Sequence, residues 1–168
     1  MSAVRSDAAL QGRREPLLRV MTVQSLDAVL AIEVQAYTFP WTRGNFIDSL
    51  AAGYLARVLL AEDGELIGYF VAMQGFEEMH LLNLTVAAPH QGRGHARRLL
   101  AELYALSASC CATAVWLEVR ESNERARALY GREGFVEAGR RRDYYPAPQG
   151  RREDALLMTR GVPREGRA

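Results

Sequence analysis

The chain has 168 residues, of which 49% are hydrophobic and 24% charged, and its formal net charge is +1. This length is enough for one domain with a full core and leaves little room for a second. All 21 basic residues are arginine, so the chain contains no lysine. That composition excludes a lysine Schiff base, a lysine general base and a Walker-type phosphate loop, each of which needs a lysine.

The first half of the chain predicts one strand, two helices and three further strands. Ser25 opens an amphipathic helix, and Thr42 caps a shorter one. Asp63-Gly64 is typical of a hairpin turn between two strands. The strand at 77–87 is apolar enough at its C-terminal end to be buried on both faces. In chain order we expect a strand at 17–23, helices at 25–37 and 42–53, and strands at 54–63, 65–75 and 77–87.

The second half predicts strands that alternate with helices. In chain order we expect a Gly-bearing turn and helix within 89–110, a strand at 113–120, a helix capped by Ser122 and ended by Gly134, and strands from Phe135 and at 153–160. Hairpins in the middle and β-α-β units later predict a mixed α/β fold, with a mostly antiparallel sheet of about seven strands and four helices. We expect one domain at 17–160, between flexible segments at 1–16 and 161–168.

Several features predict a cytoplasmic protein without membrane contact. The apolar run at 81–88 is far shorter than the roughly 20 residues of a membrane span. Residues 1–16 lack the apolar stretch of a secretory signal. Cys110 and Cys111 are adjacent, and a bridge between them would be strained, so we interpret them as free thiols in a reducing compartment. Neither cysteine has a second ligand pair nearby, so we expect no zinc site.

Charge is unevenly distributed along the chain. Residues 20–78 hold eight acidic residues and two arginines, a net charge of −6. Residues 89–152 hold twelve arginines and seven acidic residues, a net charge of +5. Two solvated surfaces would give this pattern. So would a protein whose second half holds an anionic ligand and whose first half meets a cationic one.

A Gly-rich segment from Gln91 to Ala96 lies between a predicted strand and a predicted helix. Small residues let the backbone approach a ligand closely, and the first N–H groups of a helix point toward an anion. The glycine spacing differs from the dinucleotide-binding fingerprint, and the lysine of the Walker motif is missing. By itself the segment is compatible with a pyrophosphate site and with an ordinary turn into a helix.

Three polar residues follow on the next strand and helix. Glu118 lies in an apolar strand, where an unpaired carboxylate is costly. It is therefore either satisfied by a structural partner or kept for proton transfer, with a pKa above its ordinary value. Asn123 begins the next helix, where its amide could reach a ligand. Tyr130 lies seven residues later on the same face, where it belongs either to the site or to the core.

This order of elements resembles the Gcn5-related N-acetyltransferase superfamily. The signature of that superfamily is Arg or Gln, two residues, Gly, one residue, then Gly or Ala, and QGRGHA at 91–96 matches it. Longer segments resemble the ribosomal-protein-alanine N-acetyltransferases, which acetylate the N-terminal alanine of the small-subunit ribosomal protein numbered eighteen. These segments are AYTFPW at 36–41, LLNLTV at 81–86, WLEVRESNERARALYGREGF at 116–135 and RRDYYPAPQGRREDALLM at 141–158. The resemblance implies the acyl-CoA N-acyltransferase fold, with acetyl-CoA as co-substrate and no metal.

The resemblance also implies roles for individual residues, with Glu118 as general base and Tyr130 as general acid. Contacts with acetyl-CoA are implied on the strand, in the turn and at the last helix, by Leu84, Thr85, Val86, Gln91, Gly92, Arg93, Gly94, His95, Ala96, Arg97 and Asn123. Aromatic residues of two loops would either belong to the core or shape the acceptor slot, namely Tyr37, Phe39, Trp41, Tyr144 and Tyr145. Tyr37 replaces a histidine that is usual in the family, and Asp143 replaces an asparagine.

The partner implied by the resemblance is the N-terminal peptide of a ribosomal protein. Ribosome-associated or tRNA-modification proteins are further candidate partners, and no specific binding to nucleic acid is expected. Two alternatives remain open. One is an N-acetyltransferase of broader peptide, lysine or small-amine specificity, and the other is a non-catalytic module that binds acyl-CoA.

Overall fold

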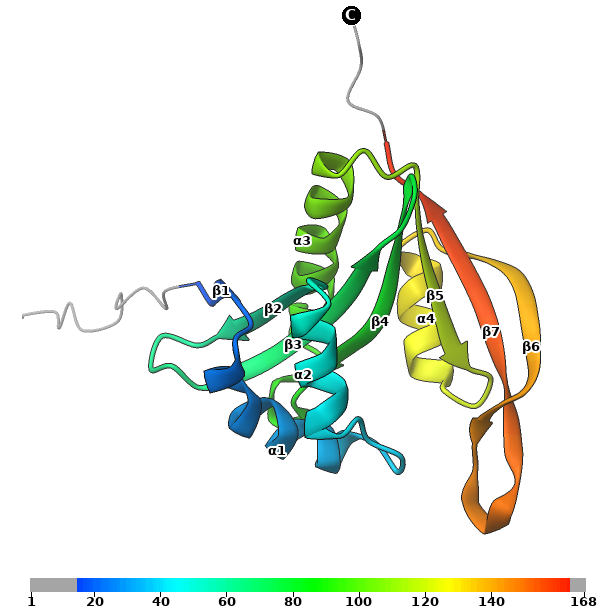
Figure 1. The fold of residues 1–168 in the computed structure, drawn as a ribbon, viewed down its shortest axis with the longest axis horizontal. Coiled ribbons are helices and arrows are strands. Elements are labelled where there is room, and N and C mark those ends of the chain that lie inside the picture. The colour runs from blue at the N-terminus through cyan, green and yellow to red at the C-terminus, as the bar shows by residue number, and fades with distance from the viewer. Residues whose placement is uncertain (1–14, 164–168) are drawn as a thin grey trace, which may run out of the picture.

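The computed structural model describes residues 15–163, which form one seven-stranded sheet with helices on both faces (Figure 1). The strands are β1 (Leu17–Val20), β2 (Leu55–Leu60), β3 (Leu66–Gln74), β4 (Glu78–Val86), β5 (Ala114–Arg120), β6 (Val136–Pro146) and β7 (Arg152–Gly161). The α-helices of the described residues are α1 (Leu26–Ala36), α2 (Arg43–Ala51), α3 (His95–Ser109) and α4 (Glu124–Arg132). The sheet order is β1-β2-β3-β4-β5-β7-β6, and only β4 and β5 pair in parallel. The predicted mixed, mostly antiparallel fold is confirmed.

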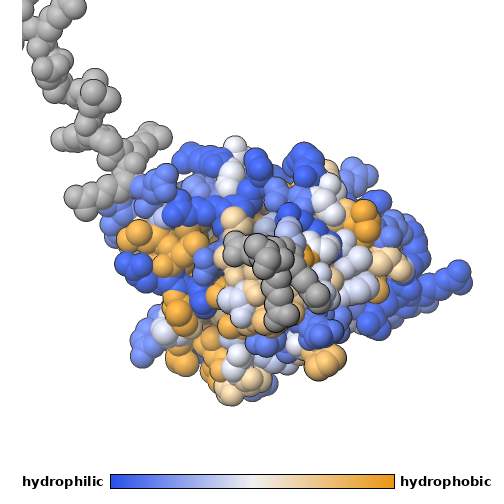
Figure 2. Space-filling model, turned by 90° about the horizontal axis from the view of Figure 1, so that it is seen from above, coloured by the Kyte–Doolittle hydropathy of each residue, from blue (hydrophilic) through white to orange (hydrophobic). Residues whose placement is uncertain are grey.

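Two hydrophobic clusters hold the helices to the two faces of the sheet. Because successive side chains of a strand point to opposite faces, β3 serves both clusters, with Tyr69 in one and Phe70 in the other. The first cluster lies under α1 and α2 and includes Val29 and Phe46. The second lies under α3 and α4 and includes the fully buried Leu100. Figure 2 shows one outer face, on which polar residues predominate and hydrophobic residues form small groups.

The two parallel strands in the middle of the sheet separate halfway along their length. Pairing between β4 and β5 runs from Glu78 opposite Ala114 to Leu81 opposite Leu117, and then ends. In Figure 1 the two strands run side by side at the top and diverge below. A bulge at Leu82, where β4 holds one residue more than β3, accompanies the divergence. The separation opens the sheet at the C-terminal ends of both strands.

The prediction that β4 is buried on both faces at this end is wrong. Thr85 is buried, whereas Leu84 and Val86 are only partly buried. The reason is the separation from β5, which leaves one face of the strand to line a cavity.

Three helix starts were predicted from capping residues, and two of them are confirmed. The Thr42 side chain accepts a hydrogen bond from Asn45 N at 3.2 Å, as expected for the cap of α2. Ser25 is the N-cap residue of α1, as predicted, although its side chain makes no capping hydrogen bond and a 3₁₀ turn at Val23–Ser25 precedes the helix. Ser122 does not cap α4, since Asn123 takes that position and accepts from Ala126 N at 3.1 Å.

The described ends of the chain bear on two further expectations. The segment expected to be flexible at 1–16 lies almost wholly outside the described residues. At the other end, Gly161 still belongs to β7 and Val162 packs against the core.

Cys110 and Cys111 carry free thiols, as predicted. Among residues 15–163, no helix is both long and apolar enough to cross a membrane.

Gly68 permits a close approach between β3 and β4, and Gly68→Ala is expected to disturb β4. An added Cβ would lie 2.6 Å from the Thr85 carbonyl oxygen and 3.2 Å from Val86 Cα, so the backbone of β4 must move. We expect a loss of about 1–3 kcal/mol in the free energy of unfolding, as for other overpacked sites. We also expect weaker binding of the acetyl-CoA that the resemblance implies, because Thr85 and Val86 line the cavity described below. Thermal unfolding and calorimetric titration measure the two effects.

Gly131→Ala is the matched control, since its Cβ would meet no atom within 4 Å and Gly131 lies in α4. Alanine in a helix should raise the stability by about 0.4–1 kcal/mol. Equal effects of the two substitutions would contradict the steric explanation.

Candidate active site

A cavity of about 400 Å³ lies where the two parallel strands separate, between the end of β4, the N-terminus of α3 and the inner face of α4. Ten of the eleven residues predicted to contact acetyl-CoA line it, and Arg93 does not. The sequence analysis missed other lining residues, of which Arg125 and Arg132 are charged. Their spacing of seven residues on a predicted helix was an available signal, because it places both on one face.

The Gly-rich turn presents unpaired N–H groups to this cavity. Gly92 and Gly94 have φ values of 74° and 82°, a left-handed conformation that favours glycine. Gly94 is the N-cap of α3, and its carbonyl accepts from Arg98 N at 3.1 Å. The N–H groups of His95, Ala96 and Arg97, which lie between Gly94 and Arg98, therefore have no acceptor within the helix. Such a helix start is a binding site for an anion such as a pyrophosphate.

Arginines give the described lining of this cavity its charge. Its arginines are Arg97, Arg125 and Arg132, and two histidines also line it. Arg97 pairs with Glu133 at 2.8 Å, outside the lining. Burial, and then the positive charges nearby, lower the pKa of His95, so its imidazole is neutral at pH 7. The arginines and the helix N-terminus therefore provide the positive potential for a polyanionic ligand.

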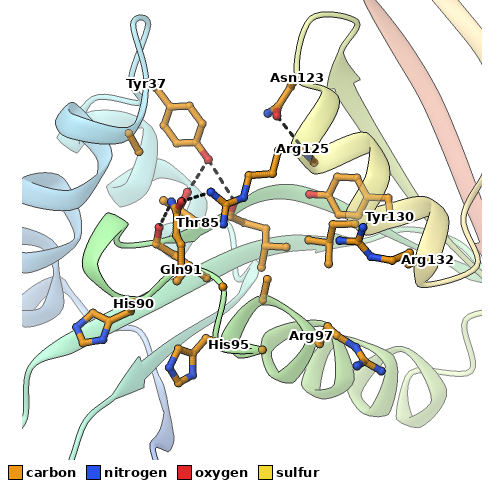
Figure 3. Close-up of a pocket in the computed structure, with 18 residues that line it drawn as sticks. Tyr37, Thr85, His90, Gln91, His95, Arg97, Asn123, Arg125, Tyr130 and Arg132 are labelled. Carbon is orange, nitrogen blue, oxygen red and sulfur yellow. Dashed lines mark hydrogen bonds between the residues drawn. The ribbon is translucent and has the colours of Figure 1, made fainter.

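The Gln91 side chain, in the Gly-rich turn, forms hydrogen bonds with both β4 and α4. Its Nε2 donates to the Val86 carbonyl at 2.9 Å, and Arg125 donates to its Oε1 at 2.6 Å. The side chain that was expected to contact the ligand is therefore engaged in shaping the cavity wall (Figure 3).

The separated edge of β4 offers backbone groups to the same cavity. The Leu84 carbonyl accepts from the Tyr37 hydroxyl at 3.2 Å, the Val86 carbonyl accepts from Gln91, and Ala87 N bonds instead to Ile67 on β3. The backbone carbonyl groups of Leu84 and Val86 thus point away from β3. Because the N–H and C=O of one strand residue point to the same side, the N–H groups of Leu84 and Val86 face the opening.

A second cavity, of about 270 Å³, adjoins the first. It is lined by the loop after α1, by β5 and by the end of β6, and it holds Glu118 with four of the five predicted acceptor residues, Tyr37, Phe39, Trp41 and Tyr145. The fifth, Tyr144, lines a neighbouring cavity of about 490 Å³ together with Glu118. The first two cavities share five lining residues, which are Tyr37, Leu84, Asn123, Ala126 and Tyr130. They therefore meet at one junction between β4 and α4.

Glu118 lies on β5 just beyond the last residue pair with β4. Its side chain is 23% exposed, and its Oε1 accepts from Arg141 Nε at 2.6 Å. The interaction with Glu118, and then burial, raise the pKa of the nearby Tyr144 hydroxyl. Arg141 is thus the partner that a carboxylate in this strand requires, and the Glu118 carboxylate still lines the second cavity.

Tyr130 lies on the opposite side of the junction, on α4. Its ring packs against Phe135 with a centroid distance of 5.5 Å, and the residue is 8% exposed. Figure 3 shows the hydroxyl groups of Tyr130 and Tyr37 directed toward the space between them. Burial raises the pKa of Tyr130, so its hydroxyl keeps its proton at neutral pH. Asn123 has its oxygen engaged in capping α4, which leaves its amide nitrogen as the group available to a ligand.

Arg120 links the two aromatic loops and was missed by the sequence analysis. Its guanidinium lies 5.7 Å from the ring centre of Phe39 and 4.5 Å from that of Tyr145. It also donates to the Pro146 carbonyl at 2.8 Å and pairs with Glu153 at 3.0 Å. One arginine thus contacts both walls of the second cavity. These walls come from segments about 100 residues apart in the chain.

Comparison with known proteins agrees with this geometry. The model of the acetyltransferase (GNAT) family matches residues 26–135. The ribosomal protein bS18-alanine N-acetyltransferase of Haemophilus ducreyi is 32% identical over 142 residues, which cover 84% of this chain and 97% of that protein. The enzyme of that name from Escherichia coli K12 is 37% identical over 133 residues, which cover 79% of this chain and 88% of its own length.

Solved structures show the same arrangement. The ribosomal-protein-S18-alanine N-acetyltransferase of Escherichia coli superposes with a TM-score of 0.81 at 33% identity, covering 90% of this chain and 97% of that one. Ard1 of Thermoplasma volcanium has the same fold, with a TM-score of 0.78 at 21% identity, covering 89% and 99% of the two chains. The chain belongs to the acetyltransferase (GNAT) family and is an acetyl-CoA-dependent N-acetyltransferase.

Proposed function

We propose that this enzyme transfers the acetyl group of acetyl-CoA to the N-terminal α-amine of a small-subunit ribosomal protein that begins with alanine. The observation that carries the proposal is the junction of two chemically different cavities, one lined by arginines and a helix N-terminus and the other holding the Glu118 carboxylate. The names of the curated relatives, which act on ribosomal protein bS18, identify the acceptor class. A cytoplasmic location is part of the same proposal.

The first cavity fits acetyl-CoA, whose thioester would supply the acetyl group. The first-turn N–H groups of α3 and the arginines at 125 and 132 suit the phosphates. The side-chain-free turn at Gly92 and Gly94 allows the backbone to approach them. The N–H groups of Leu84 and Val86 would hydrogen-bond the acyl arm and polarise the acetyl carbonyl, in the manner of an oxyanion hole.

Glu118 would act as the general base, directly or through a water molecule. An α-ammonium group has a pKa near 7.7–8.0, against about 10.4 for a lysine side chain, so its deprotonation needs about 3.5 kcal/mol less work. One carboxylate is therefore sufficient for an N-terminal amine. The free amine then attacks the acetyl carbon in a ternary complex, without a covalent acyl-enzyme.

Tyr130 would act as the general acid toward the departing thiolate. With ordinary pKa values of about 10 for tyrosine and 8.5 for a thiol, complete proton transfer is uphill by about 2 kcal/mol. Burial raises the pKa of Tyr130 and so increases this cost. As the acid at this position, it therefore donates a hydrogen bond that stabilises the developing thiolate, and complete transfer of its proton is not required for the thiolate to leave.

Two other functions make different demands on the site. An acetyltransferase for a lysine side chain would have to supply about 3.5 kcal/mol more work to deprotonate its acceptor. A non-catalytic module that binds acyl-CoA would need neither Glu118 nor Tyr130. Ribosome-associated and tRNA-modification proteins remain candidate partners of the enzyme.

The proposal is tested with the purified full-length enzyme and three acceptors: an alanine-starting peptide from the ribosomal protein, an N-blocked peptide with an internal lysine, and a polyamine. Only the first should be acetylated efficiently. Mass spectrometry of the native ribosomal protein, from cells with and without the enzyme, should show an N-terminal acetyl group that depends on the enzyme. Preferred turnover of the polyamine or the lysine peptide would overturn the proposal.

A further inference from the structure

A chain of hydrogen-bonded side chains runs from the interior to the junction of the two cavities. Glu33 on α1 is 1% exposed, and Asn83 and Thr85, on one face of β4, are 8% and 5% exposed. Asn83 Nδ2 lies 3.3 and 3.2 Å from the Glu33 carboxylate oxygens, and Thr85 Oγ1 lies 2.8 Å from Asn83 Oδ1. Tyr37 Oη completes the chain at 2.7 Å from Thr85 Oγ1 (Figure 3).

The chemistry of the groups determines the direction of every hydrogen bond in this chain. A carboxylate only accepts, so the Asn83 amide nitrogen must face Glu33 and its oxygen must face Thr85. That oxygen cannot donate, so the Thr85 hydroxyl gives its proton to Asn83. In the hydrogen bond between these two hydroxyl groups, Tyr37 is therefore the donor and Thr85 the acceptor. The Leu84 carbonyl, at 3.2 Å, competes for the same proton, and the lone pairs of the Tyr37 oxygen remain available.

Glu33 also anchors the loop that carries Tyr37. One of its carboxylate oxygens accepts from the Trp41 backbone N–H at 2.9 Å, and the other accepts from the Tyr69 hydroxyl. Burial and the nearby Glu33 raise the pKa of Tyr69, which keeps that hydroxyl a donor. The same buried carboxylate thus fixes one end of the loop directly and the Tyr37 hydroxyl through two side chains.

The orientation of Tyr37 determines which ligand group it can meet. Its oxygen lies at the junction and, because its proton is taken by Thr85 or by the Leu84 carbonyl, it can only accept a hydrogen bond from a ligand. The proposed acceptor presents an N–H donor at this place, the amino group that attacks the acetyl carbon. We propose that Tyr37 accepts a hydrogen bond from this amino group, and that Glu33, Asn83 and Thr85 are positioning residues that hold the hydroxyl in the accepting orientation. The inference rests on the proposed function.

Steady-state kinetics of four variants test this inference, with the alanine-starting ribosomal peptide as probe. Tyr37→Phe should lower kcat/KM for the peptide about tenfold, the loss expected for one hydrogen bond to a substrate, and leave the KM for acetyl-CoA within about twofold. Thr85→Val removes the hydroxyl but keeps the side-chain shape, and it should lower the same constant about threefold or more. Thr85→Ser restores the hydroxyl and should recover most of the activity. The double variant Tyr37→Phe/Thr85→Val should be no worse than Tyr37→Phe, because Thr85 acts through Tyr37.

Additive losses in the double variant would show that Thr85 acts independently, and would overturn the positioning role. A rise in the KM for acetyl-CoA that matched the loss for the peptide would assign Tyr37 to the other substrate. If Thr85→Val does not fold, as judged by thermal unfolding, the peptide and acetyl-CoA constants of Tyr37→Phe decide the question. A wild-type enzyme that does not acetylate the peptide would instead refute the proposed function, and the inference with it.

Discussion

Glu118→Gln is expected to lower the turnover number by about 100- to 10,000-fold, the contribution typical of a general base. The substitution keeps the size of the side chain and an oxygen that can still accept from Arg141, so β6, which carries Arg141, should stay in place. It removes the carboxylate that is proposed to take the proton from the amine. The cavity proposed to hold acetyl-CoA does not include Glu118, so binding of acetyl-CoA should remain unchanged. Stopped-flow turnover and calorimetric titration measure the two quantities.

Glu121→Gln is the matched control, because Glu121 follows β5 directly and also pairs with an arginine, Arg140, at 2.9 Å. It lines neither the acetyl-CoA cavity nor the cavity that holds Glu118. Its turnover should stay close to that of the wild type. Glu118→Gln with normal binding and undiminished turnover would contradict the general-base assignment and favour a non-catalytic binding module.

Tyr130→Phe is expected to lower turnover by about 10- to 100-fold, through loss of the hydrogen bond to the departing thiolate. The ring keeps its packing against Phe135, so stability should change little. Tyr104→Phe is the control, because Tyr104 packs against Phe135 at 6.4 Å but lines neither cavity of the junction. Equal turnover losses in the two variants would point to a packing effect in place of acid catalysis.

The pH dependence gives a second readout for Tyr130. Burial raises its pKa above the ordinary value of 10.0, and the acid form is the one present below the pKa. The hydroxyl therefore stays protonated up to pH 10.0, and the rate ratio of wild type to Tyr130→Phe should be constant from about pH 7 to pH 10. A ratio that fell toward 1 within this range would mean that Tyr130 loses its proton there, and would contradict the raised pKa.

Much of the candidate site was predictable because its parts lie in short segments with strong local signals. The turn at Gly92 and Gly94 has a residue pattern with few structural solutions, and ten of eleven predicted contacts line one cavity. The exception, Arg93, lies between the glycines, and its side chain is absent from that lining. The roles of Arg120 and Arg141 had no local signal. Each depends on a partner more than 20 residues away, so only the pairing of distant strands places the two groups together.

Helix and strand order, the mixed sheet and the acyltransferase resemblance followed from the sequence alone, since hydrophobic periodicity and turn residues act over a few residues. Helix starts were harder to predict, because Asn123 and not the neighbouring Ser122 caps α4, and because a 3₁₀ turn capped by Thr22 precedes α1. The separation of β4 from β5 is a feature of strand pairing: beyond Leu81, β4 remains paired with β3 and β5 with β7, but the two no longer pair with each other. No local sequence pattern encodes where this pairing ends. The route from Glu33 to Tyr37 has the same origin, since it joins residues up to 50 positions apart and exists only when α1 packs on the sheet.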